Sequence, residues 1–416
     1  MTVVAPIRAG PGSGASALIA FVLPDLRGGG VQHIVLTLAA AMLARGLRVD
    51  LVVYDAEGHL AQLVPPDVRL VPLRRAGGLA GRLAAIKADP GGLPVLARPL
   101  AALRKRAWRT VPYLPALAAY LAEARPTSVF AASPYINIEA VLARRLAGVP
   151  TRLILSERTH FSTGKAKKEW RKRILGPLMA RAYAEADAIV AVSQGVADDL
   201  ARSLQLPAEA ITVLHNPTLA KGFALKAGEP VDHPWFTGDP EVLINVGRLA
   251  PQKDHETLLR AFALVRARRP GLRLAVIGGG NENALAQLQA LAGELGIGQA
   301  VAFLGYQPNP LRYVARARLF VLSSRFEGFP NVLLEALACG TPVVSTDCPS
   351  GPREILDEGA YGELVPVGDP AAMAAAIGRT LEAPLPSSTL KARAAVFDYD
   401  TAVERYAQVL LGTVAR

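Results

Sequence analysis

Two glutamates and two cations in the second half of the chain have the residue types and spacing of a site for a charged, hydroxyl-rich ligand. Glu327 and Glu335 are eight positions apart in segment 323–356, where a predicted strand leads into a loop and then a helix. Arg248 and Lys253 are five positions apart in a loop between another predicted strand and its helix. Carboxylates can accept hydrogen bonds from sugar hydroxyls, and cations near a helix start can neutralise a diphosphate. Together the four residues indicate a ligand that carries both groups.

Each pair has a simpler explanation when it is taken alone. Glu335 could be an N-terminal helix charge and Glu327 a solvated loop residue, and the two cations could be ordinary surface residues. We expect Glu335 to be ionised, because it lies in the first turns of its helix near the positive end of the dipole. Asp347 ends the next strand and is expected in the same crevice, because ligands of open parallel sheets bind at the carboxyl ends of the strands.

Short β-rich runs alternate with longer helical runs and must position these residues. Such alternation predicts an α/β protein with parallel sheets built from right-handed βαβ units. The strands expected in the first half are 17–23, 48–54, 128–132, 152–156, 188–192 and 211–215. Those expected in the second half are 242–247, 273–278, 300–304, 319–323, 342–345 and 362–365. The pattern fades between the two halves, which predicts two domains.

The predicted organisation has five parts. We expect a disordered leader over 1–15, a first Rossmann-like domain over 16–217, a linker over 218–240, a second Rossmann-like domain over 241–395, and a C-terminal helix over 396–416. Asp400 is expected to cap that helix rather than to belong to a metal-binding Asp-x-Asp motif. After the first strand, Gly28, Gly29 and Gly30 form a loop whose backbone N–H groups could approach a phosphate, although it is neither GxGxxG nor a Walker loop.

Over nearly its whole length the chain resembles glycosyltransferase family 4, the "glycosyl transferases group 1" enzymes. Glu327 and Glu335 match the family's E-x7-E motif, Arg248 and Lys253 its phosphate-binding pair, and Gly29 with Gly30 its N-terminal glycine loop. The resemblance implies a GT-B fold, in which two Rossmann-like domains face each other and the C-terminal helix crosses back to the first domain. It also implies a retaining transferase that extends lipopolysaccharide, exopolysaccharide or lipid-linked glycans from a nucleotide diphosphate sugar, with UDP as the favoured nucleotide.

The resemblance assigns roles to individual positions. Glu335 would bind the ribose and Glu327 the donor sugar, while Arg248 and Lys253 would neutralise the leaving group. The remaining donor-side positions are Gly247, Gly278, Tyr306 near the base, and Gly328, Phe329 and Pro330 near the phosphates. Because no Asp-x-Asp lies in a strand-end loop, neither a metal nor another cofactor is expected, and the front-face mechanism of such enzymes needs no protein nucleophile.

Acceptor-side candidates follow strands of the first domain and are expected to reach the cleft. They are Asn137, Glu157, Arg158 and His160, of which His160 could equally be a polar loop histidine. Neither Cys339 nor Cys348 has a histidine partner nearby in sequence, and two cysteines do not make a disulfide framework. The alternatives to the transferase are a GT-B sugar-nucleotide epimerase, a phosphorylase, or a non-catalytic membrane-bound scaffold.

The charge of the chain is concentrated in its first half. Net charge is +11, yet residues 1–220 hold 27 basic and 15 acidic residues, whereas 221–416 hold 19 and 20. Segments 98–109 and 165–173 combine Lys and Arg with Trp108 and Trp170. This combination suits an anionic bilayer surface, although a solvated helix face or nucleic acid could also explain it. We favour the membrane over nucleic acid because no RNA-binding module accompanies the charge. No apolar run reaches 18 residues, so we expect a cytoplasmic enzyme held peripherally on the inner face of the cytoplasmic membrane.

Overall fold

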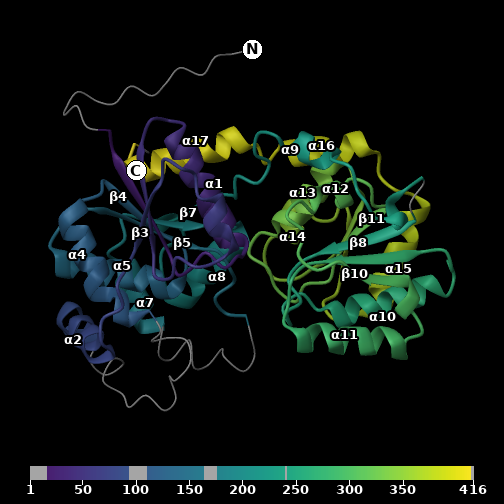
Figure 1. Ribbon diagram of the computed structural model, residues 1–416, viewed down its shortest axis with the longest axis horizontal. Coiled ribbons are helices and arrows are strands. Elements are labelled where there is room, and N and C mark those ends of the chain that lie inside the picture. The colour runs from purple at the N-terminus through teal and green to yellow at the C-terminus, as the bar shows by residue number, and fades with distance from the viewer. Residues whose placement is uncertain (1–15, 93–109, 164–175, 239–240, 414–416) are drawn as a thin grey trace.

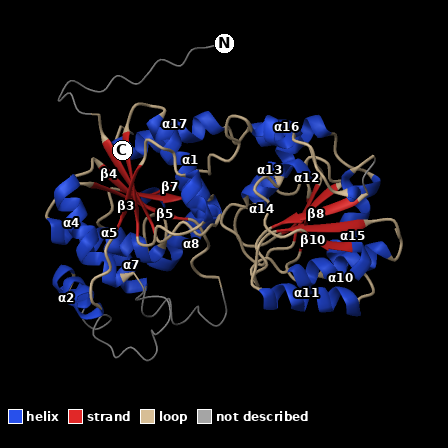
Figure 2. Ribbon diagram, viewed as in Figure 1, coloured by secondary structure: helices blue, strands red, loops and turns tan. Residues whose placement is uncertain are grey.

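A computed structural model describes residues 16–92, 110–163, 176–238 and 241–413 of the chain. Residues 1–15, 98–109 and 165–173, to which the sequence assigns a leader and two basic segments, lie outside the described residues. The chain folds into two α/β domains that lie side by side, with helices on both faces of each sheet (Figures 1 and 2). No helix in the described ranges is long and apolar enough to cross a membrane.

The first domain is built on a seven-stranded parallel sheet in the order β3-β2-β1-β4-β5-β6-β7. Its strands are β1 (Leu18–Leu23), β2 (Arg48–Val53), β3 (Arg69–Pro72), β4 (Ser128–Ala131), β5 (Arg152–Glu157), β6 (Ala188–Ala191) and β7 (Ile211–Val213). Its helices are α1 (Gly30–Leu43), α2 (Gly78–Ala88), α4 (Leu114–Ala124), α5 (Pro134–Ala147), α7 (Gly176–Tyr183) and α8 (Gln194–Leu204). The central strands are buried on both faces, as the apolar runs predicted.

The second domain carries a six-stranded parallel sheet in the order β10-β9-β8-β11-β12-β13. Its strands are β8 (Val242–Val246), β9 (Arg273–Ile277), β10 (Val301–Phe303), β11 (Leu319–Leu322), β12 (Val343–Thr346) and β13 (Glu363–Val365). Its helices are α10 (His255–Arg266), α11 (Glu282–Glu294), α12 (Leu311–Val314), α13 (Asn331–Cys339), α14 (Pro352–Ile355), α15 (Pro370–Glu382) and α16 (Ser387–Ala395). The predicted class of two parallel-sheet domains is therefore confirmed.

Two local predictions differ from the structure. Strand β3 is missing from the predicted set, because this short edge strand is mostly exposed and therefore lacks an apolar pattern. The stretch expected to be a linker, 218–240, contains helix α9 (Phe223–Gly228), which packs against α12 of the second domain.

The C-terminal helix α17 (Tyr399–Leu411) lies against the first domain, although α16 just before it packs on the second (Figure 1). The hydroxyl of Tyr406 donates to the Leu214 carbonyl at 3.1 Å, and Arg405 donates to the Val213 carbonyl at 3.1 Å. Asp398, not Asp400, caps this helix, since its carboxylate accepts from the N–H of Thr401 at 2.7 Å. The predicted cap was therefore two residues too late.

Candidate active site

An ion pair between Lys253 and Glu327 lies where two strand-end loops of the second domain meet. The Lys253 ammonium is 2.6 Å from Glu327 Oε1, and the hydroxyl of Ser324 donates to the same oxygen at 2.6 Å. The two side chains of the ion pair are 16% and 8% exposed. The glutamate expected at the donor sugar is thus held by the lysine expected at the diphosphate.

Hydrogen bonds join these two loops into one unit. The N–H of Arg325 donates to the Gln252 carbonyl at 2.8 Å, and the Ser323 hydroxyl donates to the Lys253 carbonyl at 2.7 Å. Arg325 also pairs at 3.0 Å with buried Asp254, the first residue before α10, which has a φ of 48°. An aspartate in this left-handed conformation is unusual, and its bond to Arg325 helps to hold it there. The loops are therefore fixed relative to each other by more than the ion pair.

Arg248 lies in the same loop but is exposed and has no acidic partner among the described residues. Its guanidinium is therefore free to bind an anion bidentately. The aliphatic part of Lys253 lies over Gly247, where an added Cβ would sit 3.3 Å from Lys253 Cδ. The short loop after β8 thus carries both cations, Arg248 exposed and Lys253 packed on Gly247.

The glycine loop after β9 packs directly on the loop after β8. An added Cβ at Gly278, whose φ is 151°, would sit 2.0 Å from the Gly247 carbonyl oxygen. The N–H of Leu249 donates to the Gly279 carbonyl at 2.9 Å, and Tyr306 lies beside Gly279. Gly247, Gly278 and Tyr306, three of the positions predicted from sequence, thus lie together at one edge of the second sheet.

Glu335 lies on α13, where its carboxyl loses more water than its place near the helix start suggested. Burial raises the pKa of its carboxyl to about 7, opposed by the nearby charge of Lys226. Glu335 is the fifth residue of the helix and is flanked by buried Leu334 and Ala336. The stabilisation of a negative charge by a helix dipole fades beyond the first turn, so desolvation dominates.

Asp347, expected in the same crevice, pairs with Arg353. The Nε of Arg353 donates to Asp347 Oδ1 at 3.2 Å, and the same guanidinium also contacts Glu358. The pair is exposed on the side of α14. Asp347 thus pairs with an arginine of α14, while the loop that follows Asp347 also contacts Glu327, whose N–H donates to the Pro349 carbonyl at 3.4 Å.

The glycine loop of the first domain faces Tyr306 of the second domain through His59. An added Cβ at Gly28 would sit 2.6 Å from the His59 ring, and the rings of His59 and Tyr306 are 5.0 Å apart. Gly29 has a φ of 153° and Gly30 begins α1. The loop predicted to approach a phosphate therefore lies at the interface between the domains.

Two of the acceptor-side candidates, Asn137 and Glu157, are buried rather than exposed at a surface. Asn137 is 0% and Glu157 is 1% exposed. The Asn137 amide donates to Glu157 at 3.0 Å and to the Tyr183 hydroxyl at 2.6 Å, and Tyr183 donates to Glu157. Burial and the charge of Glu157 raise the pKa of Tyr183. These residues form a buried polar network beneath the sheet edge.

Arg158 is also buried, and its side chain lies against Asn216 in the segment that follows β7. Its guanidinium donates to the Asn216 side chain and lies 5.5 Å from the Phe130 ring centroid and 5.8 Å from that of Tyr406. Asn216 in turn donates at 2.8 Å to Asn331, the first residue of α13. Arg158 thus contacts the segment after β7 and the terminal helix α17.

His160, the fourth acceptor-side candidate, is half-buried and lies beside a carboxylate. Its Nδ1 lies 3.1 Å from Asp199, and the N–H of Ser162 donates to the same carboxylate at 2.9 Å. Burial lowers the pKa of His160, while the charge of Asp199 opposes that shift. No motif in the sequence pairs His160 with Asp199, which lies 39 positions later in α8.

Four polar residues near these loops were not singled out from the sequence. They are Ser193, Ser324, Ser350 and Glu354. Serines next to predicted loops are too common to stand out, and Glu354 follows the Asp347 motif without a partner in sequence. Ser324 and Ser350 contact the loop after β11 within the second domain, whereas the contacts of Ser193 and Glu354 join the two domains.

The chain has two Rossmann-like domains that face each other, and its terminal helix packs on the first. This arrangement defines the GT-B class. Cations and carboxylates lie at the sheet edge of the second domain. Residues 28–218 match the family model "Glycosyltransferase Family 4", and residues 233–396 match "Glycosyl transferases group 1". The chain belongs to this glycosyltransferase family, as its motifs indicated.

Curated relatives match part of the chain. An N-acetylgalactosaminyltransferase of Campylobacter jejuni, named for a diphospho-undecaprenol-linked substrate, is 32% identical over 59% of this chain and 64% of its own length. A lipopolysaccharide 1,6-galactosyltransferase of Salmonella typhimurium is 34% identical over 44% of this chain and 49% of its own length. The chain therefore spans less than two thirds of these relatives in the matched regions.

Solved structures share the fold along the whole chain. HepE of Anabaena, determined with UDP and glucose, superimposes with a TM-score of 0.73 at 18% identity, covering 96% of this chain and 100% of that one. At this identity the likeness establishes the GT-B fold, and the ligands belong to HepE.

Proposed function

We propose that the protein is a retaining glycosyltransferase that moves a hexose or N-acetylhexosamine from a nucleotide diphosphate sugar to a lipid-linked or surface-glycan acceptor. The observation that carries the proposal is the ion pair between Lys253 and Glu327. Beside it lies Arg248, which has no acidic partner in the part of the chain that the structure describes. The carboxylate that binds the sugar and the two cations that bind the diphosphate would then lie on two loops, after β8 and β11, that hydrogen bonds join to each other.

The leaving diphosphate is the group that these cations serve. When the glycosidic bond to the phosphate breaks, negative charge develops on the departing oxygen, and preorganised cations stabilise that charge. Arg248 and Lys253 can do this without a metal ion, so we propose that the transfer is metal-independent. In a front-face reaction the departing phosphate takes the proton of the acceptor hydroxyl while the new glycosidic bond forms on the same face.

The nucleoside is assigned to the edge formed by Glu335 and Tyr306. A carboxylate can accept hydrogen bonds from both ribose hydroxyls, and Glu335 has no hydrogen-bond partner among the described residues. Hydrogen bonds from the ribose hydroxyls would replace those that the Glu335 carboxyl loses to water when it is buried, and they would lower its raised pKa. We favour a uridine donor, which the UDP in the HepE structure supports by analogy.

The acceptor is assigned to the first domain. This domain carries nearly all of the basic excess, and the relatives are named for lipopolysaccharide and diphospho-undecaprenol substrates. An acceptor anchored in a bilayer cannot diffuse to the enzyme, so we propose peripheral attachment to the inner face of the cytoplasmic membrane. The basic segments 98–109 and 165–173 are the parts of the sequence that would contact anionic lipid.

An epimerase or phosphorylase would use the same fold with different chemistry, and a scaffold would use none. A panel of UDP- and GDP-sugars, incubated with lipid-linked oligosaccharide acceptors in EDTA, separates these functions. The proposal predicts nucleoside diphosphate release that depends on the acceptor and yields an α-linked product from an α-linked donor. Interconversion of free sugar nucleotides, phosphate-dependent cleavage, or a strict need for a divalent metal would contradict it.

A further inference from the structure

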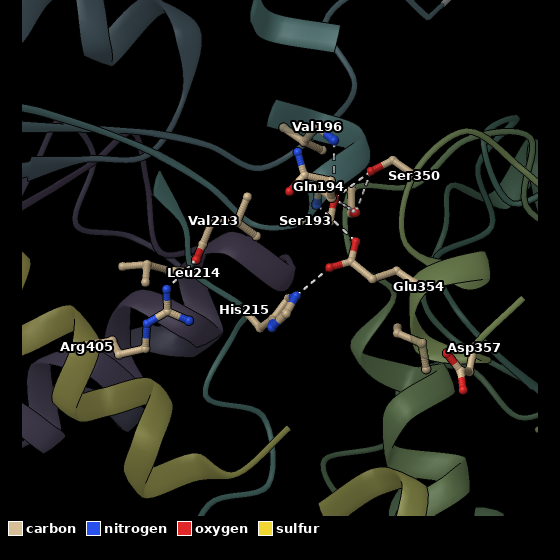
Figure 3. Close-up of polar contacts among 12 residues, drawn as sticks. Ser193, Gln194, Val196, Val213, Leu214, His215, Ser350, Glu354, Asp357 and Arg405 are labelled. Carbon is tan, nitrogen blue, oxygen red and sulfur yellow. Dashed lines mark hydrogen bonds and ion pairs between the residues drawn. The ribbon is translucent and has the colours of Figure 1, made fainter. Parts of the chain in front are cut away.

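Polar contacts between the two domains converge on the loop that follows Glu327. The hydroxyl of Ser193, at the N-terminus of α8 in the first domain, donates to the Gly328 carbonyl at 2.7 Å. The hydroxyl of Ser350 in the second domain donates to the same carbonyl at 2.8 Å, and the two hydroxyl oxygens are 2.7 Å apart. Ser193 and Ser350 point toward each other in Figure 3.

A second contact lies beside the first and involves Glu354 of α14. One carboxylate oxygen accepts from the backbone N–H of Gln194 at 3.0 Å, and the other is 2.5 Å from Nε2 of His215 (Figure 3). The His215 ring also stacks on Phe329, with centroids 5.0 Å apart and planes 30° apart. One carboxylate of the second domain thus binds both α8 and the segment after β7 of the first domain.

These contacts orient the peptide that joins Gly328 to Phe329. A trans peptide is planar and places its C=O and N–H on opposite sides. Because the Gly328 carbonyl is turned toward Ser193, the N–H of Phe329 points away from the first domain. The backbones of the two domains also approach closely here, since an added Cβ at Gly328 of the second domain would sit 2.0 Å from the Arg158 carbonyl oxygen of the first.

We propose that Ser193 and Glu354 are positioning residues through which the first domain fixes the donor-sugar loop, Glu327 to Pro330, adding to the hydrogen bond that Ser350 makes from within the second domain. Ser193 fixes the Gly328–Phe329 peptide directly. Glu354 acts indirectly, because it holds α8 and His215 of the first domain against the second domain. The first domain would thereby complete the hydrogen bonding of the loop beside Glu327, whose carboxylate is itself held within the second domain by Lys253 and Ser324. This inference rests on the proposed function of Glu327.

The first test measures domain contact without any substrate. A Ser193→Cys/Ser350→Cys double variant, treated with diamide as the two-electron oxidant, should form an internal disulfide, because the native hydroxyls are 2.7 Å apart. Each single cysteine variant controls for pairing with Cys339 or Cys348. Adding Glu354→Ala should slow the cross-linking about tenfold, which corresponds to about 1.4 kcal/mol of lost contact at the interface.

The matched control for that test is Asp357→Asn. Asp357 is three residues further along, has a φ of 51°, which Asn tolerates, and makes a 3.9 Å ion pair within its own domain. This substitution should leave cross-linking unchanged. Equal cross-linking rates with and without the Glu354→Ala substitution would overturn the role of Glu354, whatever substrate the protein uses.

The second test separates positioning from binding or folding. Glu354→Ala and Ser193→Ala should lower kcat by about 10- to 100-fold, since a misplacement of about 1 Å can cost that much. UDP affinity, measured by calorimetry, should change by less than about threefold. Glu354→Gln should recover part of the rate, because its amide oxygen can still accept from Gln194. A loss of UDP affinity of about tenfold or more, or no rescue by Gln, would overturn the proposal.

Discussion

The ammonium of Lys253 and the carboxylate of Glu327 lie 2.6 Å apart across two loops that are 74 positions apart in sequence. Both side chains are largely buried, whereas Arg248 in the same loop is exposed. The two cations are therefore expected to respond differently when they are removed.

Removing either cation should impair transfer, but only one removal should also weaken the fold. Arg248→Ala and Lys253→Ala should each raise the activation free energy by about 2–4 kcal/mol, the range for a lost electrostatic donor. Lys253→Ala also leaves a buried carboxylate without its cation, which should cost about 1–3 kcal/mol of stability. Steady-state kinetics and thermal unfolding measure the two effects. Equal melting temperatures for Lys253→Ala and Arg248→Ala would contradict the structural role of the ion pair.

Glu335→Gln should make stability less sensitive to pH. In the folded protein the pKa of Glu335 is about 7, above its ordinary 4.5, so the folded state holds this proton more tightly than the unfolded state does. The resulting stabilisation is present below pH 4.5 and is lost as pH rises to about 7. The variant should therefore gain melting temperature over wild type at about pH 8 and little at about pH 5. A constant difference across this range would argue against a raised pKa.

The same substitution tests the ribose assignment. An ionised carboxylate accepts from both hydroxyls, so UDP affinity of the wild-type protein should increase as pH rises through about 7. The difference between wild type and Glu335→Gln, measured by calorimetry, cancels the titration of UDP itself. If UDP bound both proteins equally at about pH 8, Glu335 would not be the ribose ligand.

Gly328→Ala should hold the domains apart. The added methyl would sit 2.0 Å from the Arg158 carbonyl oxygen, and backbone atoms cannot move out of the way as a side-chain end can. We expect transfer to fall by about 100-fold, with nucleotide affinity largely kept. Gly293→Ala in α11, where an added Cβ meets nothing within 4 Å, is the matched control and should be neutral or slightly stabilising. Full activity of Gly328→Ala would show that close domain contact is unnecessary.

Membrane attachment should depend on the basic segment 165–173. Neutralising Lys167, Lys168, Arg171 and Lys172 together should abolish binding to anionic vesicles while sparing hydrolysis of the soluble donor. Wild-type binding should be absent on neutral vesicles and released by salt, since the Debye length falls from ~10 Å at 0.1 M to ~3 Å at 1 M.

A control with the same change of charge uses exposed cations of the second domain. It neutralises Arg260, Arg269, Arg318 and Arg379. This variant should bind vesicles as the wild type does. If the 167–172 variant also bound normally, segment 98–109 would be the remaining candidate for attachment.

Sequence patterns predicted the class of fold, and they placed the residues proposed for the donor site at the ends of strands. Strand–helix alternation requires parallel sheets, and in a parallel sheet every strand ends at the same edge. Glu327, Arg248, Lys253 and Gly278 each follow a strand, so their convergence follows from topology. The exposed edge strand β3 escaped detection because it carries no apolar alternation.

The tertiary structure alone decided which of these polar groups are exposed, buried or paired. Glu335 carries a raised pKa and Asn137 and Glu157 are buried, because neighbours from other elements remove water from them. Asp347 pairs with Arg353 at the surface. Ser193 and Gly328 meet across 135 positions of sequence. The local sequence pattern indicates which helix, strand or loop a residue belongs to. Desolvation and hydrogen bonds between the domains depend instead on packing between elements that are far apart in the sequence.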